Sequence, residues 1–141
     1  MEISKQWQLA RGAAERYERI LVPAILGPAA QALVDWTGLR DGESVVDVGC
    51  GTGAAAQGAA KKVGPKGRVA GVDLNPGMID VARSIPPNSG APIEWFEDNA
   101  GPVFQPSHDG LKVEKLGNPA QKSFPVSFCS ARRGWAREPL R

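Results

Sequence analysis

The chain has 141 residues, of which 42% are hydrophobic, so a single domain with a modest core is expected. Its net charge of +2 is too small an excess to imply a nucleic acid or an anionic membrane as partner. No uninterrupted apolar run approaches the roughly 18 residues that cross a bilayer, and the first twelve residues lack a signal-peptide centre, so a cytoplasmic protein is expected.

The N-terminal third is predicted to be helical. A short helix is expected near residues 6–19, where Trp7, Leu9 and Tyr17 are the apolar anchors. In residues 20–38 the apolar positions recur every three or four residues, which is typical of an amphipathic helix that packs one face on a sheet. Pro23 and Pro28 are expected to interrupt this second helix.

Strands and helices then alternate. The predicted elements are a buried strand at Ser44–Val48, a helix at Ala54–Val63, a strand at residues 67–74, a helix opened by Asn75 and Pro76, and a strand at Ile93–Glu97. This order implies a parallel sheet with right-handed crossovers. The predicted fold class is therefore α/β, a doubly wound, Rossmann-like sheet that is incomplete within this chain.

The regular pattern ends near Ala100. Residues 101–141 contain five prolines and scattered glycines, and only the stretch FPVSFCS resembles a strand. We expect a core domain over residues 1–100 and an irregular tail, disordered or divergent, over residues 101–141. His108, the single histidine, falls in this tail and is interpreted as a solvated loop residue.

The stretch VVDVGCGTG ends the first predicted strand and carries Gly49, Gly51 and Gly53. A loop between a strand and a helix lies at the carboxyl edge of the sheet, beside the unpaired N–H groups of the following helix. Glycine permits both the tight turn and the close approach of a ligand to the backbone. The spacing indicates a binding edge for a nucleotide-like ligand.

Two acidic residues accompany the loop. Asp73 ends the second predicted strand about twenty residues further on, a spacing at which a carboxylate can accept hydrogen bonds from both ribose hydroxyls. A helix cap is the other interpretation of Asp73, although Asn75 can already cap that helix. Asp47 lies on a buried strand, where a carboxylate is costly unless it faces a cationic or hydrogen-bond-donating ligand.

Together these residues resemble a known family. VVDVGCGTGAAA is similar to the first motif of class I S-adenosylmethionine-dependent methyltransferases, and VAGVDLNPGMIDVAR is similar to the strand and helix that follow it. The leading YERILVPAILGP and the strand IEW resemble the small-molecule group related to ubiquinone and menaquinone methyltransferases. The resemblance covers residues 7–100 and implies S-adenosyl-L-methionine as the cofactor.

The resemblance also assigns roles to residues. It places the three glycines around the methionine part of the cofactor, Asp47 toward its amino group, Asp73 on the ribose hydroxyls, and Leu74 and Met78 near the adenine. Either Asp98 or Asn99 would meet the adenine edge. The full predicted cofactor-binding set is Asp47, Gly49, Cys50, Gly51, Thr52, Gly53, Asp73, Leu74, Asn75, Met78, Asp98 and Asn99.

The later strands of that family, which shape the acceptor pocket, are not recognisable after Ala100. The sequence therefore assigns no catalytic residue, and Cys50, with no base near it in sequence, is interpreted as a small loop residue. Cys50 and Cys129 are expected to be free thiols without a metal. We expect a methyltransferase acting on a small-molecule acceptor, truncated and weakly active. A non-catalytic cofactor-binding or interaction module and, less favoured, an NAD-dependent oxidoreductase are the alternatives.

Overall fold

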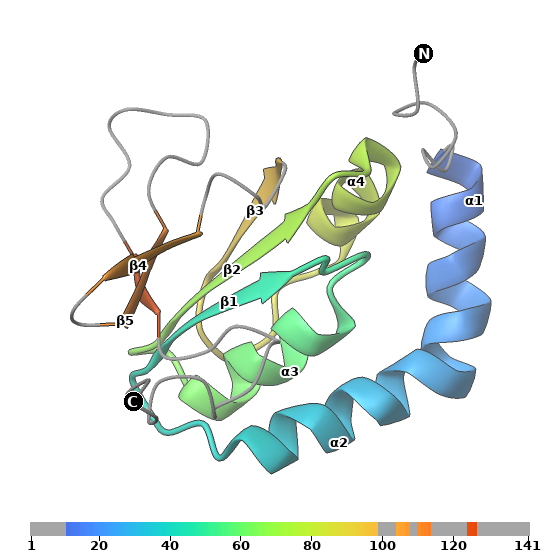
Figure 1. Ribbon diagram of the computed structural model, residues 1–141. Helices are drawn as coiled ribbons and strands as arrows, with labels where there is room; N and C mark the ends of the chain where they lie inside the picture. Colours follow the sequence, from blue (N-terminus) through green and yellow to red (C-terminus); the bar gives the residue numbers. More distant parts are fainter. Residues whose placement is uncertain (1–10, 99–103, 108–109, 114–123, 127–141) are drawn as a thin grey trace, which may run out of the picture.

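Figure 1 shows an open parallel sheet with helices beside it, as the sequence predicted. The computed structural model describes residues 11–98, 104–107, 110–113 and 124–126, and the side chains of residues 11–98. The strands lie in the order β1-β2-β3, and both neighbouring pairs are parallel. The elements up to residue 98 are α1 (Arg11–Arg16), the π-helix η2 (Tyr17–Leu26), α2 (Gly27–Thr37), β1 (Ser44–Val48), α3 (Ala54–Val63), β2 (Arg68–Asp73), α4 (Pro76–Ser84) and β3 (Ile93–Glu97).

The core lies between the sheet and α3. Val45 and Val69 are neighbours in register and fully buried, and they pack with the alanines of α3. Alanine lets this helix approach the sheet closely, because it adds no bulk beyond Cβ. Val34 of α2 joins the same cluster, so α2 packs beside α3. The predicted strands at residues 44–48 and 93–97 and the helix at residues 54–63 are confirmed.

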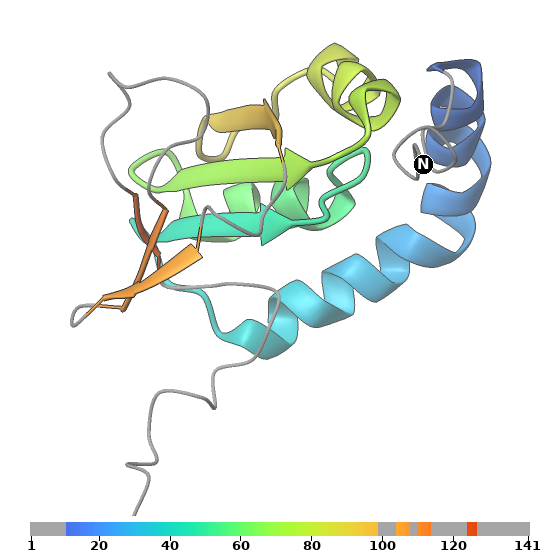
Figure 2. The same cartoon turned by 45° about the horizontal axis from the view of Figure 1, so that its top comes forward.

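The predicted break at Pro23 and Pro28 is wrong. Helical structure runs without interruption from Arg11 to Thr37, and Figure 2 shows it curving around the outside of the domain. Pro23 lies inside η2, where the Gly27 N–H donates to the Val22 carbonyl five residues earlier. The wider π-turn accommodates a proline ring that would clash with the carbonyl four residues before it in an α-helix. Pro28 lies in the first turn of α2, which directly follows η2, and the helical run continues through it.

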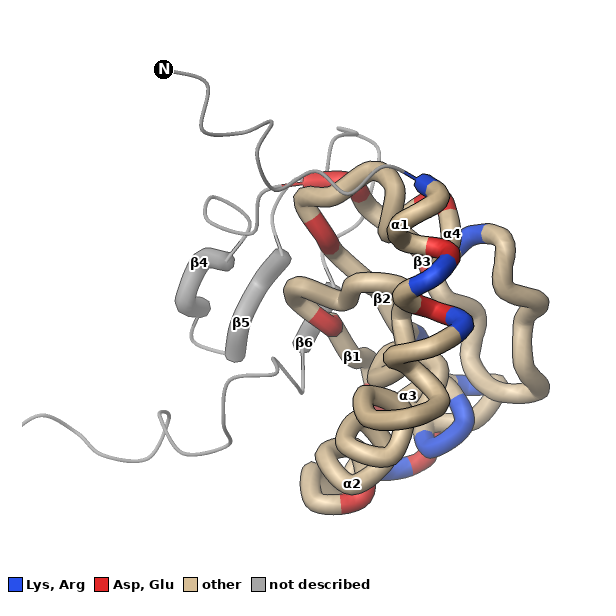
Figure 3. Tube along the Cα trace, turned by 90° about the vertical axis from the view of Figure 1, so that its right-hand side faces the viewer, with Lys and Arg blue, Asp and Glu red and all other residues tan. Residues whose placement is uncertain are grey.

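The N-terminal helical run is also apolar on average, although charged residues interrupt it and it contains no uninterrupted apolar stretch of roughly 18 residues. It spans 27 residues, and its best 18-residue window has a mean hydropathy of 1.3 with 11% of the window buried. By length and composition alone, it meets the criteria for a membrane-spanning helix, as core helices and signal sequences also do. Figure 3 shows basic and acidic positions interspersed along residues 11–98, the helix α1 included.

Three short strands fall in the segment predicted to be irregular. They are β4 (Phe104–Ser107), β5 (Gly110–Val113) and β6 (Phe124–Val126), and they form a separate antiparallel sheet in that order. The strand β6 coincides with the start of the FPVSFCS stretch. Pro106 and Pro125 lie in the two outer strands, where an absent N–H is tolerated.

Candidate functional site

The glycine loop folds back over the end of β2. The N–H groups of Gly49 and Cys50 both donate to the Val72 carbonyl, at 2.8 and 3.0 Å. Gly49, Gly51 and Gly53 have φ values of 69°, 56° and 93°, a region that residues with a Cβ rarely adopt. The loop therefore places its backbone at the carboxyl edge of the sheet, as the sequence predicted.

Asp73 ties the loop to the following helix. Its Oδ2 accepts from the Gly51 N–H and its Oδ1 accepts from the Asn75 N–H, each at 2.8 Å. The side chain of Asn75, in turn, accepts from the N–H groups of Gly77 and Met78, so Asn75 is the helix cap. Each Asp73 oxygen retains a lone pair for a further donor. Asp73 is thus a hydrogen-bond acceptor that the backbone holds in place beside the glycine loop.

Asp47 is the buried acid of the site. Only 7% of it is exposed, and its Oδ2 accepts from the N–H of Ala56 in the first turn of α3, at 3.0 Å. Burial raises the pKa of Asp47 to about 6; the Ala56 hydrogen bond opposes this rise, and the negative charge of Asp73 adds to it. A cationic ligand beside Asp47 would favour the charged form, so the site is electrostatically matched to a cation.

Asp47 is expected to make stability depend on pH. Its pKa is raised on folding, so its contribution to stability is full below pH 4 and is lost as the pH rises through about 6. The difference between the two pKa values corresponds to a fall of about 3 kcal/mol in the free energy of unfolding. Asp47→Asn should remove this dependence and be the more stable protein at pH 8.

Denaturant unfolding of both proteins between pH 4.5 and pH 8 measures this effect. Asp35→Asn is the control, because Asp35 is exposed and pairs with Lys62 at 2.7 Å. It should leave the fall between pH 4.5 and pH 8 in place. A pH profile of Asp47→Asn parallel to that of the unsubstituted chain would contradict the assignment of the buried charge.

Cys50 and Thr52 are the buried side chains of the loop, with exposures of 8% and 1%. The Cys50 thiol donates to the Gly51 carbonyl at 3.6 Å, and burial is the largest cause that raises its pKa well above the ordinary value. The thiol is therefore neutral at pH 7, which agrees with its interpretation as a small loop residue. The Thr52 hydroxyl has no hydrogen-bond partner in the described part of the chain.

The indole ring of Trp95, on β3, packs against the glycine loop. This contact was not predicted from the sequence. A Cβ on Gly53 or on Gly71 would meet the indole ring of Trp95, and a Cβ on Gly71 would also lie 3.1 Å from the Cys50 sulfur. With the Trp95 ring in this position, only glycine fits at residues 53 and 71. Gly71 gave a signal that could have revealed this contact, since glycine within a strand often marks a close approach.

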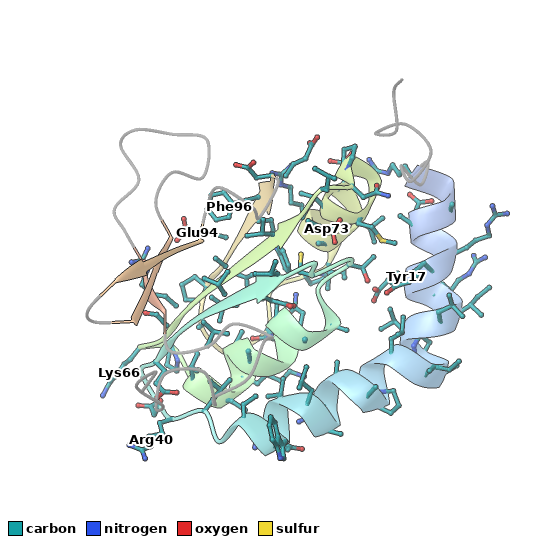
Figure 4. All side chains as sticks on the ribbon, in the orientation of Figure 1. Tyr17, Arg40, Lys66, Asp73, Glu94 and Phe96 are labelled. Atoms are coloured by element: carbon teal, nitrogen blue, oxygen red, sulfur yellow. The ribbon has the colours of Figure 1, made fainter. Side chains whose placement is uncertain are left out.

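Tyr17 of η2 closes the other side of the loop and was also missed. Its hydroxyl lies 3.6 Å from the position that a Cβ on Gly51 would take. Figure 4 shows Tyr17 on the side of its helix that faces the carboxyl ends of the strands, where Asp73 lies. Burial is the largest cause that raises the pKa of Tyr17, and the charges of Asp73 and Glu18 add to it. The phenol therefore remains a proton donor at neutral pH.

The other predicted site residues lie around this centre. Leu74 is 61% exposed next to Asp73. Met78 is buried and packs with Ala14, Val81 and the ring of Tyr17. The backbone N–H of Asp98 donates to the Asp73 carbonyl at 3.1 Å, so Asp98 reaches the same edge. Asn99 lies outside the described residues, and the cofactor roles of the whole set stay predictions.

Residues 45–110 match the family described as a methyltransferase domain. The chain is 46% identical over 67 residues to the aklanonic acid methyltransferase DauC of a Streptomyces species, covering 48% of this chain and 30% of that protein. It is 45% identical over 101 residues to the demethylmenaquinone methyltransferase of Symbiobacterium thermophilum, covering 71% of this chain and 34% of that protein.

A solved S-adenosylmethionine-dependent methyltransferase from Aquifex aeolicus aligns with a TM-score of 0.44 at 26% identity, over 55% of this chain and 40% of the other. The chain spans about a third of the length of the curated relatives it matches. The family match confirms the resemblance predicted from the glycine loop, which lies inside the matched region.

Proposed function

Because residues 45–110 are a methyltransferase domain, we propose that the chain binds S-adenosylmethionine and contributes to methyl transfer to a small-molecule acceptor. The observation that carries the proposal is Asp73, held by the N–H groups of Gly51 and Asn75 at the mouth of a positive-φ glycine loop. This geometry supports a role for the carboxylate in holding the ribose hydroxyls of the cofactor. The relatives named for aklanonic acid and demethylmenaquinone support a small-molecule acceptor.

The residues of the site fit this cofactor. The loop offers a backbone cradle, since a Cβ at any of its three glycines would be strained and one at Gly53 would also strike Trp95. Asp47 and Asp73 form no ion pair with a Lys or Arg among residues 11–98. The buried Thr52 hydroxyl is likewise without a partner there. An acidic sheet edge with unused polar atoms suits a ligand that carries an ammonium, a sulfonium and hydroxyl groups.

Each side chain then has a specific task. Bound at this edge, S-adenosylmethionine would supply an electrophilic methyl group on its sulfonium. Asp73 orients the ribose through two acceptors whose positions the backbone already fixes. Asp47, held by the first turn of α3, provides the negative charge for the amino group. The ring of Trp95 lies against Gly53 of the loop, and the residues that align the acceptor are not assigned.

A dinucleotide is the competing ligand, because Gly49, Gly51 and Ala54 also satisfy the general dinucleotide pattern. The raised pKa of buried Asp47 favours S-adenosylmethionine over NAD, whose diphosphate would bring negative charge toward a second acid. We expect calorimetry to show binding of S-adenosylhomocysteine and no comparable binding of NAD. Tighter binding of NAD would reject the proposal.

A non-catalytic cofactor-binding module is the second candidate. It is favoured by β1, which has a strand on one side only in the sheet β1-β2-β3 and could pair with another chain. The two candidates differ in turnover: the isolated chain would bind the cofactor in both cases, but only the enzyme would methylate an acceptor. Transfer of labelled methyl groups to a panel of quinols and phenols distinguishes them.

A further inference from the structure

The helical segment before the glycine loop turns one charged side chain inward. Glu18 is half-buried, and its Oε2 is enclosed completely. It lies four residues after the buried Ala14 and four before the half-buried Val22, on the stripe that faces the domain. The other charged residues of η2 and α1 are exposed, and they are Arg11, Glu15, Arg16 and Arg19.

The enclosed oxygen of Glu18 has no hydrogen-bond partner in the part of the chain that the structure describes. Among the same residues, Glu18 forms no ion pair with a Lys or Arg. An enclosed carboxylate oxygen without a partner is unfavourable, and a cation bound beside it would compensate for the lost hydration. Asp47 and Asp73, on the sheet side, accept backbone hydrogen bonds but likewise form no ion pair with a Lys or Arg among residues 11–98.

The turn that carries Glu18 lies against the cofactor site. The hydroxyl of the preceding residue, Tyr17, lies 3.6 Å from the position that a Cβ on Gly51 would take, and Tyr17 packs against the cluster that contains Met78. This turn belongs to the π-helix, a helical irregularity that is frequent at functional sites. The turn that carries Tyr17 and Glu18 thus faces Asp73 across the glycine loop. We call this turn the helical wall of the site; it presents a phenol and a carboxylate that are adjacent in the sequence.

We propose that Tyr17 and Glu18 form the helical wall of the cofactor site and that the Glu18 carboxylate makes the site prefer a cationic sulfonium over the neutral thioether left after methyl transfer. The inference rests on the proposed function and deepens it. The preference follows from Coulomb attraction, which acts on the sulfonium and is absent for the thioether. Such a preference would favour release of the product.

Calorimetry with three probes tests the proposal. S-adenosylmethionine carries the sulfonium, sinefungin carries an ammonium at the equivalent position, and S-adenosylhomocysteine is neutral there. Glu18→Gln should weaken binding of the two cationic probes about tenfold and leave S-adenosylhomocysteine within twofold. The matched control is Glu15→Gln, an exposed position one turn from Arg11, which should leave all three affinities within twofold.

The outcomes separate the inference from the proposed function. An equal loss for all three probes, or no loss, would overturn the role of Glu18 in sensing charge. Failure of the unsubstituted chain to bind any of the three would instead reject the proposed function. Tyr17→Phe keeps the ring that packs against the cluster of Ala14, Met78 and Val81, and it should weaken all three probes equally, about fivefold. Unchanged binding in Tyr17→Phe would show that the Tyr17 hydroxyl makes no contribution to cofactor binding.

Discussion

Gly53→Ala is expected to destabilise the chain by about 2 to 5 kcal/mol and to abolish measurable cofactor binding. Two causes add. A residue with a Cβ at φ +93° is strained by about 1 to 2 kcal/mol. The new Cβ would also meet the indole ring of Trp95, and such overpacking costs about 1 to 3 kcal/mol. A domain of this size has only several kcal/mol of stability to lose.

Gly49→Ala is the matched control for this prediction. Gly49 has a similar positive φ of 69°, yet a Cβ there would meet no atom within 4 Å. It should therefore suffer the backbone strain alone, and the difference between the two variants measures the contact with Trp95. Thermal or denaturant unfolding of both proteins gives that difference. Equal stabilities would show that Trp95 does not support the loop.

Asp73→Ala is expected to weaken binding of S-adenosylhomocysteine at least tenfold. The substitution removes two acceptors for the ribose hydroxyls, and each charge-assisted hydrogen bond contributes about 1.5 to 3 kcal/mol. It also releases the N–H groups of Gly51 and Asn75, so the loop loses its link to α4. The helix itself should persist, because Asn75 still caps it.

Calorimetry on Asp73→Ala and Asp73→Asn separates the two roles of this residue. The amide of Asn can still accept one of the backbone hydrogen bonds but carries no charge, so it should support the loop and bind more weakly than the carboxylate. Asp80→Ala, at an exposed position on α4, is the control and should bind as the unsubstituted chain does. Unchanged affinity in Asp73→Ala would limit this residue to holding the loop.

Much of the fold could be predicted from the sequence, because its signals are local. The β-branched residues Val45, Val46 and Val48 favour a buried strand, and the pair Asn75-Pro76 favours the start of a helix. The glycines of the loop were predicted to allow a tight turn, and all three have positive φ. Each of these features depends on a few neighbouring residues, so a short stretch of sequence is enough to predict it.

The contacts that shape the site were decided only by the tertiary structure. Tyr17 meets Gly51, and Trp95 meets Gly53 and Gly71, across separations of 24 to 42 residues that no local pattern reveals. The course of the helix through Pro23 was also missed, because an i to i−5 hydrogen bond leaves no mark in the sequence. Local propensities determine the elements and the loop of this protein. Packing between distant elements determines which side chains enclose its binding edge.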